Sequence, residues 1–145
     1  MDNILHMVGL ALRAGRLEVG EEPVGAACRA RDCRLILVAR DAADNSFRRV
    51  RHFADAGQCL WVSVPYTKEE LGQAVGRTAC AMAAVTDIGF AEAIGQKLAA
   101  LDPEKYAITA EKLHVKAERA AQRRKKQQAH ERNVRRGGKK HGGKS

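Results

Sequence analysis

The sequence predicts an α/β sandwich followed by a basic helical extension, and three observations lead to this prediction. Short aliphatic runs at residues 34–39, 60–64 and 80–86 have the length and composition of buried strands. Segments of helical length alternate with these runs, which is typical of α/β sandwiches. After residue 102 the chain is rich in charged residues and has few apolar ones that could enter a core.

The first helix is expected to start at the amino terminus, because Asp2 or Asn3 can cap it. Apolar residues then recur at helical spacing until Gly15 ends the helix. Residues 16–19 are expected to form a short extended segment before the turn at Gly20.

Two further helices are expected in the first half of the chain. One covers about residues 21–30, because carboxylates and a proline favour a helix start in its first turn. The other covers about residues 47–56, with Asp44 or Ser46 as its cap and Gly57 at its end.

The second half carries two clear capping signals. Thr67 and Glu70 have the spacing of a capping box, which predicts a short helix to about Val75. Asp87 is the expected cap of a helix over about residues 89–99.

The extension is expected to be a helix at about residues 103–133, because Asp102 and the following proline form a start signal and no glycine or proline interrupts it. Residues 134–145 are rich in glycine and lysine and are expected to be flexible. The sequence therefore divides into a domain at residues 1–101 and an extension at residues 102–145.

The net positive charge of the chain lies in its extension. Residues 103–145 contain fourteen Lys/Arg against four acidic residues, whereas residues 1–102 contain twelve against thirteen. The net charge of +9 therefore comes from the carboxyl-terminal third. A nearly neutral body with a basic extension predicts a polyanionic partner.

The sequence gives no sign of an enzyme, a metalloprotein or a membrane protein. It contains no phosphate-binding loop, dinucleotide fingerprint, zinc-protease motif or nucleophile elbow, so we expect no catalytic residues and no cofactor. Its four cysteines form no C-x-x-C pair and are expected to be reduced, partly buried small hydrophobes without a metal: Cys28, Cys33, Cys59 and Cys80. No apolar run approaches the roughly 20 residues of a membrane span. We expect a soluble, cytoplasmic monomer.

Four sequence blocks resemble the kink-turn RNA-binding ribosomal protein superfamily of the ribosomal L-seven-Ae and L-thirty-e type, and within it the small bacterial YlxQ-like branch. The blocks are residues 7–20 (MVGLALRAGRLEVG), 34–41 (RLILVARD), 67–76 (TKEELGQAVG) and 83–89 (AAVTDIG). The resemblance spans about residues 3–98. It implies a three-layer α-β-α sandwich with a mixed four-stranded sheet, and RNA binding without catalysis.

The resemblance also implies an RNA-binding turn at Gly20, Glu21 and Glu22. The family pattern there is Gly-x-Asn-Glu-x-x-Lys, and its glycine matches Gly20. Glu22 stands at the asparagine position, Pro23 at the glutamate and Ala26 at the lysine. A carboxylate repels phosphate, and the missing lysine removes one phosphate contact.

The second RNA-facing element of the family is the loop before the last strand, which matches Arg77, Thr78 and Ala79 here. Arg13 and Arg16 flank the binding turn and can add positive charge. The alternative for each arginine is a solvated surface residue.

The extension is expected to bind RNA phosphates without reading sequence, because it has no aromatic residue beyond Tyr106 for base stacking. A disordered, solubilising tail is the alternative. The candidate RNA-binding residues of the extension are Lys116, Arg119, Arg123, Arg124, Lys125, Lys126, Arg132, Arg135 and Arg136.

These observations favour a non-catalytic RNA-binding protein whose affinity comes largely from the extension. The expected partner is structured RNA or ribosomal RNA, with ribosomal or transcription and translation proteins as further partners. The alternative function is a protein–protein adaptor on the same machinery that contacts RNA only nonspecifically.

Overall fold

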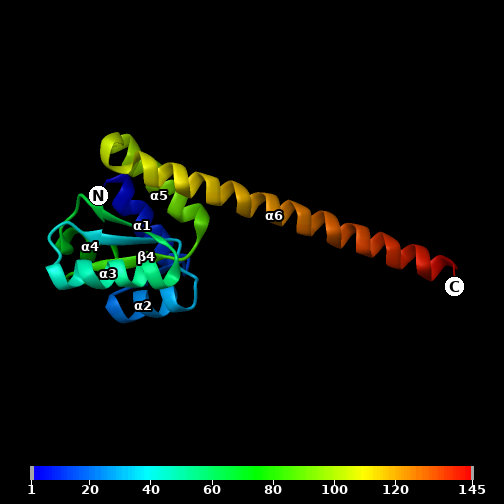
Figure 1. Ribbon diagram of the computed structural model, residues 1–145, viewed down its shortest axis with the longest axis horizontal. Helices are drawn as coiled ribbons and strands as arrows, with labels where there is room; N and C mark the ends of the chain where they lie inside the picture. The colour runs from blue at the N-terminus through cyan, green and yellow to red at the C-terminus, as the bar shows by residue number, and fades with distance from the viewer. Residues whose placement is uncertain (1, 145) are drawn as a thin grey trace.

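A mixed four-stranded sheet lies between two layers of helices, and one long helix extends away from the body (Figure 1). The computed structural model describes the backbone of residues 2–144 and the side chains of residues 2–135. The strands are β1 (Leu17–Val19), β2 (Leu35–Ala39), β3 (Leu60–Val64) and β4 (Met82–Val85), in the order β1-β4-β2-β3. Only β2 and β3 pair in parallel, so the sheet is mixed as expected.

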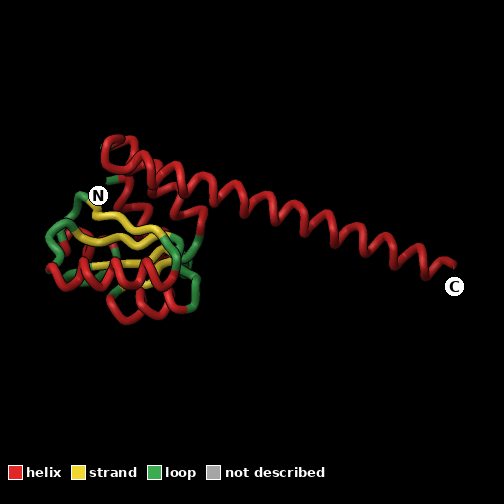
Figure 2. The backbone as a smooth tube through the Cα atoms, viewed as in Figure 1, coloured by secondary structure: helices red, strands yellow, loops and turns green. Residues whose placement is uncertain are grey.

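The helices cover both faces of the sheet (Figure 2). They are α1 (Asn3–Arg13), α2 (Glu21–Arg29), α3 (Asp44–Gly57), α4 (Lys68–Ala74), α5 (Ile88–Leu101) and α6 (Pro103–Lys144). None of the helices described combines the length and the apolar character that a membrane crossing requires.

Strand β2 divides the core into two clusters. Its residues Leu35, Leu37 and Ala39 face one cluster, which is closed by apolar residues of α1, α4, α5 and the start of α6. Ile36 and Val38 face the other cluster, which α2 and α3 close. Because successive side chains of a strand point to opposite faces, one fully buried strand can serve both layers. The predicted three-layer α/β sandwich is confirmed.

Strand β3 differs from the prediction of a buried strand. It is an edge strand, and its residues Leu60, Trp61 and Ser63 are only half-buried. Aliphatic composition indicates a strand, but the position of that strand in the sheet depends on pairing with distant segments.

The predicted caps at the starts of three helices are confirmed. The Asp2 carboxylate accepts a hydrogen bond from the Leu5 N–H at 2.8 Å, and Asp87 caps α5 in the same way. Thr67 and Glu70 form the full capping box at the start of α4. These bonds satisfy backbone donors that a helix start leaves without partners.

Helix α3 starts earlier than expected. Asp44 belongs to its first turn, and the cap residue is Ala43, whose side chain makes no hydrogen bond. The helix ends at Gln58, which adopts a left-handed conformation with φ of 51°. Neither Asp44 nor Ser46 is therefore the cap, and Gly57 remains within the helix.

The first turns of α6 are part of the core. Tyr106 and Leu113 are buried, and the Tyr106 hydroxyl donates a hydrogen bond of 2.5 Å to the Ser63 carbonyl oxygen of β3. Leu113 packs over Gly95 of α5, where an added Cβ would lie only 2.7 Å from the Leu113 Cδ1. This contact lets α5 and α6 approach closely. We call residues 103–121, which carry these contacts, the α6 root.

Beyond this root α6 continues to Lys144, although the sequence suggested an end at about residue 133 and a flexible tail at residues 134–145. Glycine costs about 1 kcal/mol in a helix but does not forbid it, whereas proline, which also blocks a backbone hydrogen bond, is absent there. The helix has 42 residues, about 63 Å at about 1.5 Å per residue. We call residues 122–144 the α6 arm, which projects away from the body (Figure 1).

His114 links the α6 root to α5. Its Nδ1 lies 2.6 Å from the Glu92 carboxylate, and its Nε2 lies 3.1 Å from that of Glu118. The hydrogen bond to Glu92 is the largest cause of a raised pKa for His114, to which the charges of Glu118 and Glu111 add. When protonated, the His114 side chain therefore helps to fasten α6 to α5.

We predict that Leu113→Ala lowers the free energy of unfolding by about 2–5 kcal/mol, because it leaves a cavity between α5 and α6. Ile108→Ala is the matched control, since Ile108 lies on the same helix and is 73% exposed. Its effect should stay within about 0.5 kcal/mol. Urea denaturation measures both values. Equal values for the two variants would show that Leu113 does not anchor α6.

We predict that the stabilisation from His114 depends on pH. Because its pKa is raised in the folded state, the contribution is complete below the pKa of a free imidazole, about 6.5, and disappears as the pH rises through the raised value. Urea denaturation of the native protein and of His114→Gln should give a larger difference at about pH 5.5 than at about pH 9. His52→Gln on α3 serves as the control. A pH-independent difference would contradict this role.

Candidate nucleic-acid interface

The turn before α2 and the loop before β4 lie next to each other. The Gly20 N–H donates a hydrogen bond of 3.1 Å to the Met82 carbonyl oxygen. A Cβ added at Gly20 would lie 3.9 Å from Nη1 of Arg77. Two segments that the family resemblance implicates in RNA binding therefore form one surface. We call it the Gly20–Arg77 face and define it as residues 20–22 and 77–79.

Two glycines of the predicted 67–76 block place the loop. An added Cβ at Gly72 would lie 2.8 Å from the Ala79 Cα, so only glycine lets α4 approach the loop this closely. Gly76 has a φ of 72°, which glycine adopts without strain. Arg77, Thr78 and Ala79 are consequently held in an exposed position.

The acidic residues of this face are partly neutralised. Arg49 of α3 forms an ion pair of 2.7 Å with Glu21, and both side chains are about half exposed. Exposed pairs contribute little to stability, but this one offsets a carboxylate beside the turn. Glu22 is exposed. Arg13 is exposed at the end of α1, so it adds charge near the start of β1.

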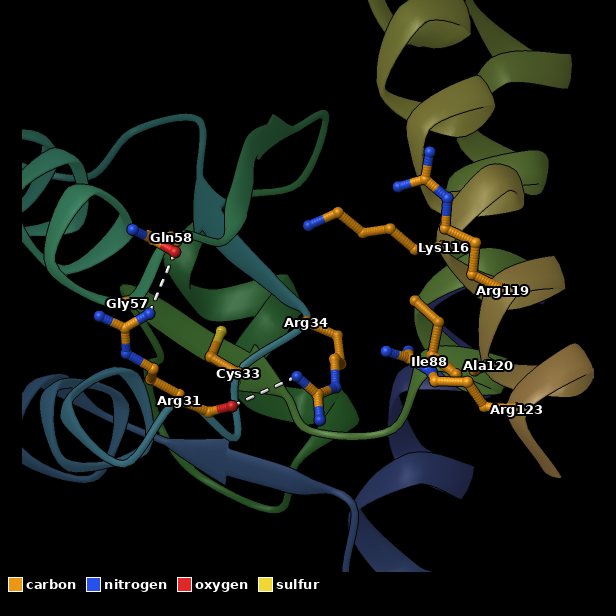
Figure 3. A pocket seen from close by; sticks show the side chains of 10 residues that line it. All are labelled: Arg31, Cys33, Arg34, Gly57, Gln58, Ile88, Lys116, Arg119, Ala120 and Arg123. Carbon is orange, nitrogen blue, oxygen red and sulfur yellow. Dashed lines mark hydrogen bonds between the residues drawn. The ribbon is translucent and has the colours of Figure 1, made fainter. Parts of the chain in front are cut away.

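A second basic surface lies between the body and α6. It is a cavity of about 480 Å³, which we call the α6 groove (Figure 3). No acidic residue is among those that line it. The lining residues are Arg31, Cys33, Arg34, Gly57, Gln58, Ile88, Lys116, Arg119, Ala120 and Arg123.

Five cations meet in this groove from two parts of the chain. Arg31 and Arg34 come from the connection between α2 and β2, and Lys116, Arg119 and Arg123 come from α6. Figure 3 shows the Lys116 side chain pointing from α6 across the cavity toward the body. The three α6 residues were predicted from the sequence, whereas the two arginines of the body were not.

Hydrogen bonds fix the two body arginines. Arg31 Nη1 donates to the Gln58 Oε1 at 3.0 Å, and Arg34 Nη1 donates to the Arg31 carbonyl oxygen at 3.2 Å. Arg31 also has a φ of 60°, which turns the chain sharply between α2 and β2. Both side chains are exposed and leave guanidinium donors for a ligand. The sequence signal for Arg34 was its position directly before a buried strand, and Arg31 had none.

Arg34 connects the α6 groove with another cavity of about 650 Å³. This second cavity contains Arg16, and also Pro23 and Ala26 at positions where the family pattern has other residues. Glu18 and Asp32 line it as well, so its charge is mixed. Arg16 and Arg34 thus extend the basic surface from the α6 groove toward the start of α2.

The other predicted residues of the extension lie along the α6 arm. Their side chains are exposed. The four adjacent cations at residues 123–126 project in several directions, because successive residues of a helix are about 100° apart around its axis. Arg136 lies outside the residues whose side chains the structure describes. The exposed residues are Arg124, Lys125, Lys126, Arg132 and Arg135.

Three of the four cysteines converge beside the α6 groove, and one of them, Cys33, lines it. The Sγ atoms of Cys28, Cys33 and Cys59 all lie within 4.8 Å of one another. Hydrogen bonding to Cys33 lowers the pKa of Cys59 to about 7, whereas burial raises the pKa of Cys28 to about 11. The spacing of these residues along the chain does not indicate the cluster. Among the described residues, these three cysteines are the group whose side chains lie close enough together to hold a metal ion.

Comparisons with known proteins agree with this architecture. No protein-family model matches the chain. It is 36% identical over 89 residues to the RNA-binding protein YlxQ of Bacillus subtilis strain 168, an alignment that covers 59% of this chain and 84% of the relative. It is 29% identical over 92 residues to the RNA-binding protein YlxQ of Enterococcus faecium, covering 61% and 84%.

A solved structure of a protein with unknown function from Bacillus halodurans matches with a TM-score of 0.61 and 26% identity. It covers 66% of this chain and 96% of that one. The chain is 36% identical to the Bacillus subtilis protein, and the alignment covers 84% of that relative, so the chain belongs to the YlxQ family.

Proposed function

We propose that this protein binds RNA without catalysing a reaction, and that the α6 groove and the α6 arm hold the phosphate backbone. The observation that carries the proposal is the meeting of five cations from the body and α6 around one cavity without an acidic residue. Both YlxQ relatives are named RNA-binding proteins, which supports RNA as the partner. Neither name denotes an enzyme, which agrees with a non-catalytic role.

Electrostatics favour a phosphate ligand in the groove. Like charges at close range repel one another, and a phosphate backbone relieves that repulsion. Each cation that neutralises a phosphate also releases condensed counterions, which drives binding. Arg31 and Arg34 are held by hydrogen bonds, so less side-chain freedom is lost when they bind.

The proposed ligand is structured RNA, with ribosomal RNA as its candidate source. The α6 arm has no aromatic side chain that could stack on bases, so it contacts the backbone rather than reading sequence. An extended helix with cations on several sides is suited to a folded RNA that presents phosphates from more than one strand. Selectivity then comes from the shape of the RNA.

We assign a secondary role to the Gly20–Arg77 face. The turn and the loop that the kink-turn superfamily resemblance implicates lie side by side, and Arg77, whose Nη1 lies 3.9 Å from an added Gly20 Cβ, is the proposed phosphate contact there. Glu22, Pro23 and Ala26 lack the family's base-contacting and phosphate-contacting groups. In this proposal the face orients the RNA while the groove and the arm supply most of the affinity.

We predict that the double variant Arg31→Ala/Arg34→Ala weakens RNA binding and reduces its salt dependence. Loss of two phosphate contacts should make the slope of log affinity against log salt shallower by about 1.4–1.8. The probe is a fluorescently labelled RNA hairpin with a single-stranded extension, titrated at several salt concentrations.

Arg40→Ala/Arg48→Ala is the matched control. Both arginines are exposed, and Arg40 follows β2 at the end opposite Arg34, about 20 Å away for six residues of extended strand. The control should leave the slope almost unchanged. Equal losses in both variants would mean that RNA senses only the net charge, and unchanged binding in the Arg31 and Arg34 variant would exclude the groove as the RNA site.

A further inference from the structure

Three thiols that are distant in sequence form a triangle beside the α6 groove. Cys28 lies near the end of α2, Cys33 in the connection to β2, and Cys59 directly before β3. The Cys28 and Cys59 sulfurs are 3.9 Å apart, and all three sulfurs lie within 4.8 Å of one another. Cys28 and Cys33 are buried, whereas Cys59 is half-buried.

The backbone around the thiols is shaped to bring them together. The left-handed conformation of Arg31 turns the chain back after α2, so that Cys33 lies near Cys28. An added Cβ at Gly57 would lie 2.8 Å from the Cys28 carbonyl oxygen, so glycine lets the end of α3 pack directly against α2. The hydrogen bond from the Arg31 side chain to the Gln58 side chain joins the same two segments at the surface.

We propose that Cys28, Cys33 and Cys59 form a three-thiolate binding site for Zn²⁺. Three sulfurs of a tetrahedral zinc site with Zn–S bonds of about 2.3 Å lie about 3.8 Å apart, and the Cys28 and Cys59 sulfurs are 3.9 Å apart. Where a separation reaches the upper limit of 4.8 Å, each sulfur needs to move by no more than about 0.6 Å toward the centre of the triangle. The site is thus nearly preformed.

The α6 groove provides space for a fourth ligand. Zinc in proteins is normally four-coordinate, and within the described part of the chain no further His, Cys, Asp or Glu joins this cluster. Cys33 lines the groove, so a water molecule can complete the coordination from that side. Cu⁺, the other common thiophilic ion, does not need a fourth ligand, because three thiolates can complete its coordination.

The charge of the surroundings also suits a thiolate complex. Binding of Zn²⁺ forms three Zn–S bonds, and the three S–H protons pass to solvent. The resulting complex has one net negative charge, which faces the cations of the groove. Figure 3 shows Lys116 pointing toward this wall of the cavity.

Cys80 provides an internal control. It is also buried, but it belongs to the core cluster on the other face of the sheet, and its thiol donates a hydrogen bond to the Met82 carbonyl oxygen at 3.2 Å. It is buried like Cys28 and Cys33 but does not converge with other cysteines. Cys80→Ser therefore tests whether replacing a buried cysteine outside the cluster also weakens Zn²⁺ binding.

The test is a metal titration of the reduced full-length protein after treatment with a chelator. We expect one equivalent of Zn²⁺ to bind, and one equivalent of Co²⁺ to give the intense visible absorption of cobalt coordinated by thiolates. Cys33→Ser and Cys59→Ser should each weaken Zn²⁺ binding by more than about 100-fold, which exceeds the usual cost of losing a residue that only hydrogen-bonds to a ligand. Cys80→Ser should bind as the native protein does.

The native titration decides the proposal even if a cysteine variant does not fold. Absence of Zn²⁺ binding by the reduced native protein would overturn it, and so would a Cys80→Ser variant that loses as much affinity as Cys59→Ser. Preferential uptake of Cu⁺ with no thiolate spectrum for Co²⁺ would overturn the assignment to zinc. None of these readouts depends on RNA, so the site is tested separately from the proposed function.

Discussion

The burial of the α6 root in the core is the constraint on which the rest of the structure depends. Tyr106 bonds to the edge strand β3, and Leu113 occupies the space that Gly95 leaves on α5. Because these contacts fix both the position and the direction of α6, the arm leaves the body at a defined angle rather than as a loose tail. The α6 groove exists only because its α6 wall is held in this way.

This anchoring changes the meaning of the charge asymmetry in the sequence. A basic tail on a neutral body would attract any polyanion, with no preferred geometry. Here Lys116 and Arg119 lie on the fixed part of the helix and face Arg31 and Arg34 of the body. The body therefore forms part of the basic surface, because Arg31 and Arg34 line the α6 groove together with the cations of α6.

Features that depend on local hydrogen bonds were predictable from the sequence, and features that depend on convergence were not. The Thr67 and Asp87 caps lie within three residues of their partners, so spacing alone identifies them. The edge position of β3 and the groove arginine Arg34 depend on contacts between distant segments. The same holds for Cys59, which lies 31 residues from Cys28 in sequence and 3.9 Å from it in space.

The central claim is that a fixed basic helix and the body bind RNA together, with much of the affinity in the arm. The most direct test compares the salt dependence of RNA binding for the full chain and for a chain ending at residue 121, which retains Tyr106 and Leu113. If about five of the removed cations contact a single strand, the slope of log affinity against log salt should become shallower by about 3.5. Affinity should also fall by about tenfold or more at low salt. An unchanged slope and affinity in a folded truncated protein would contradict the account.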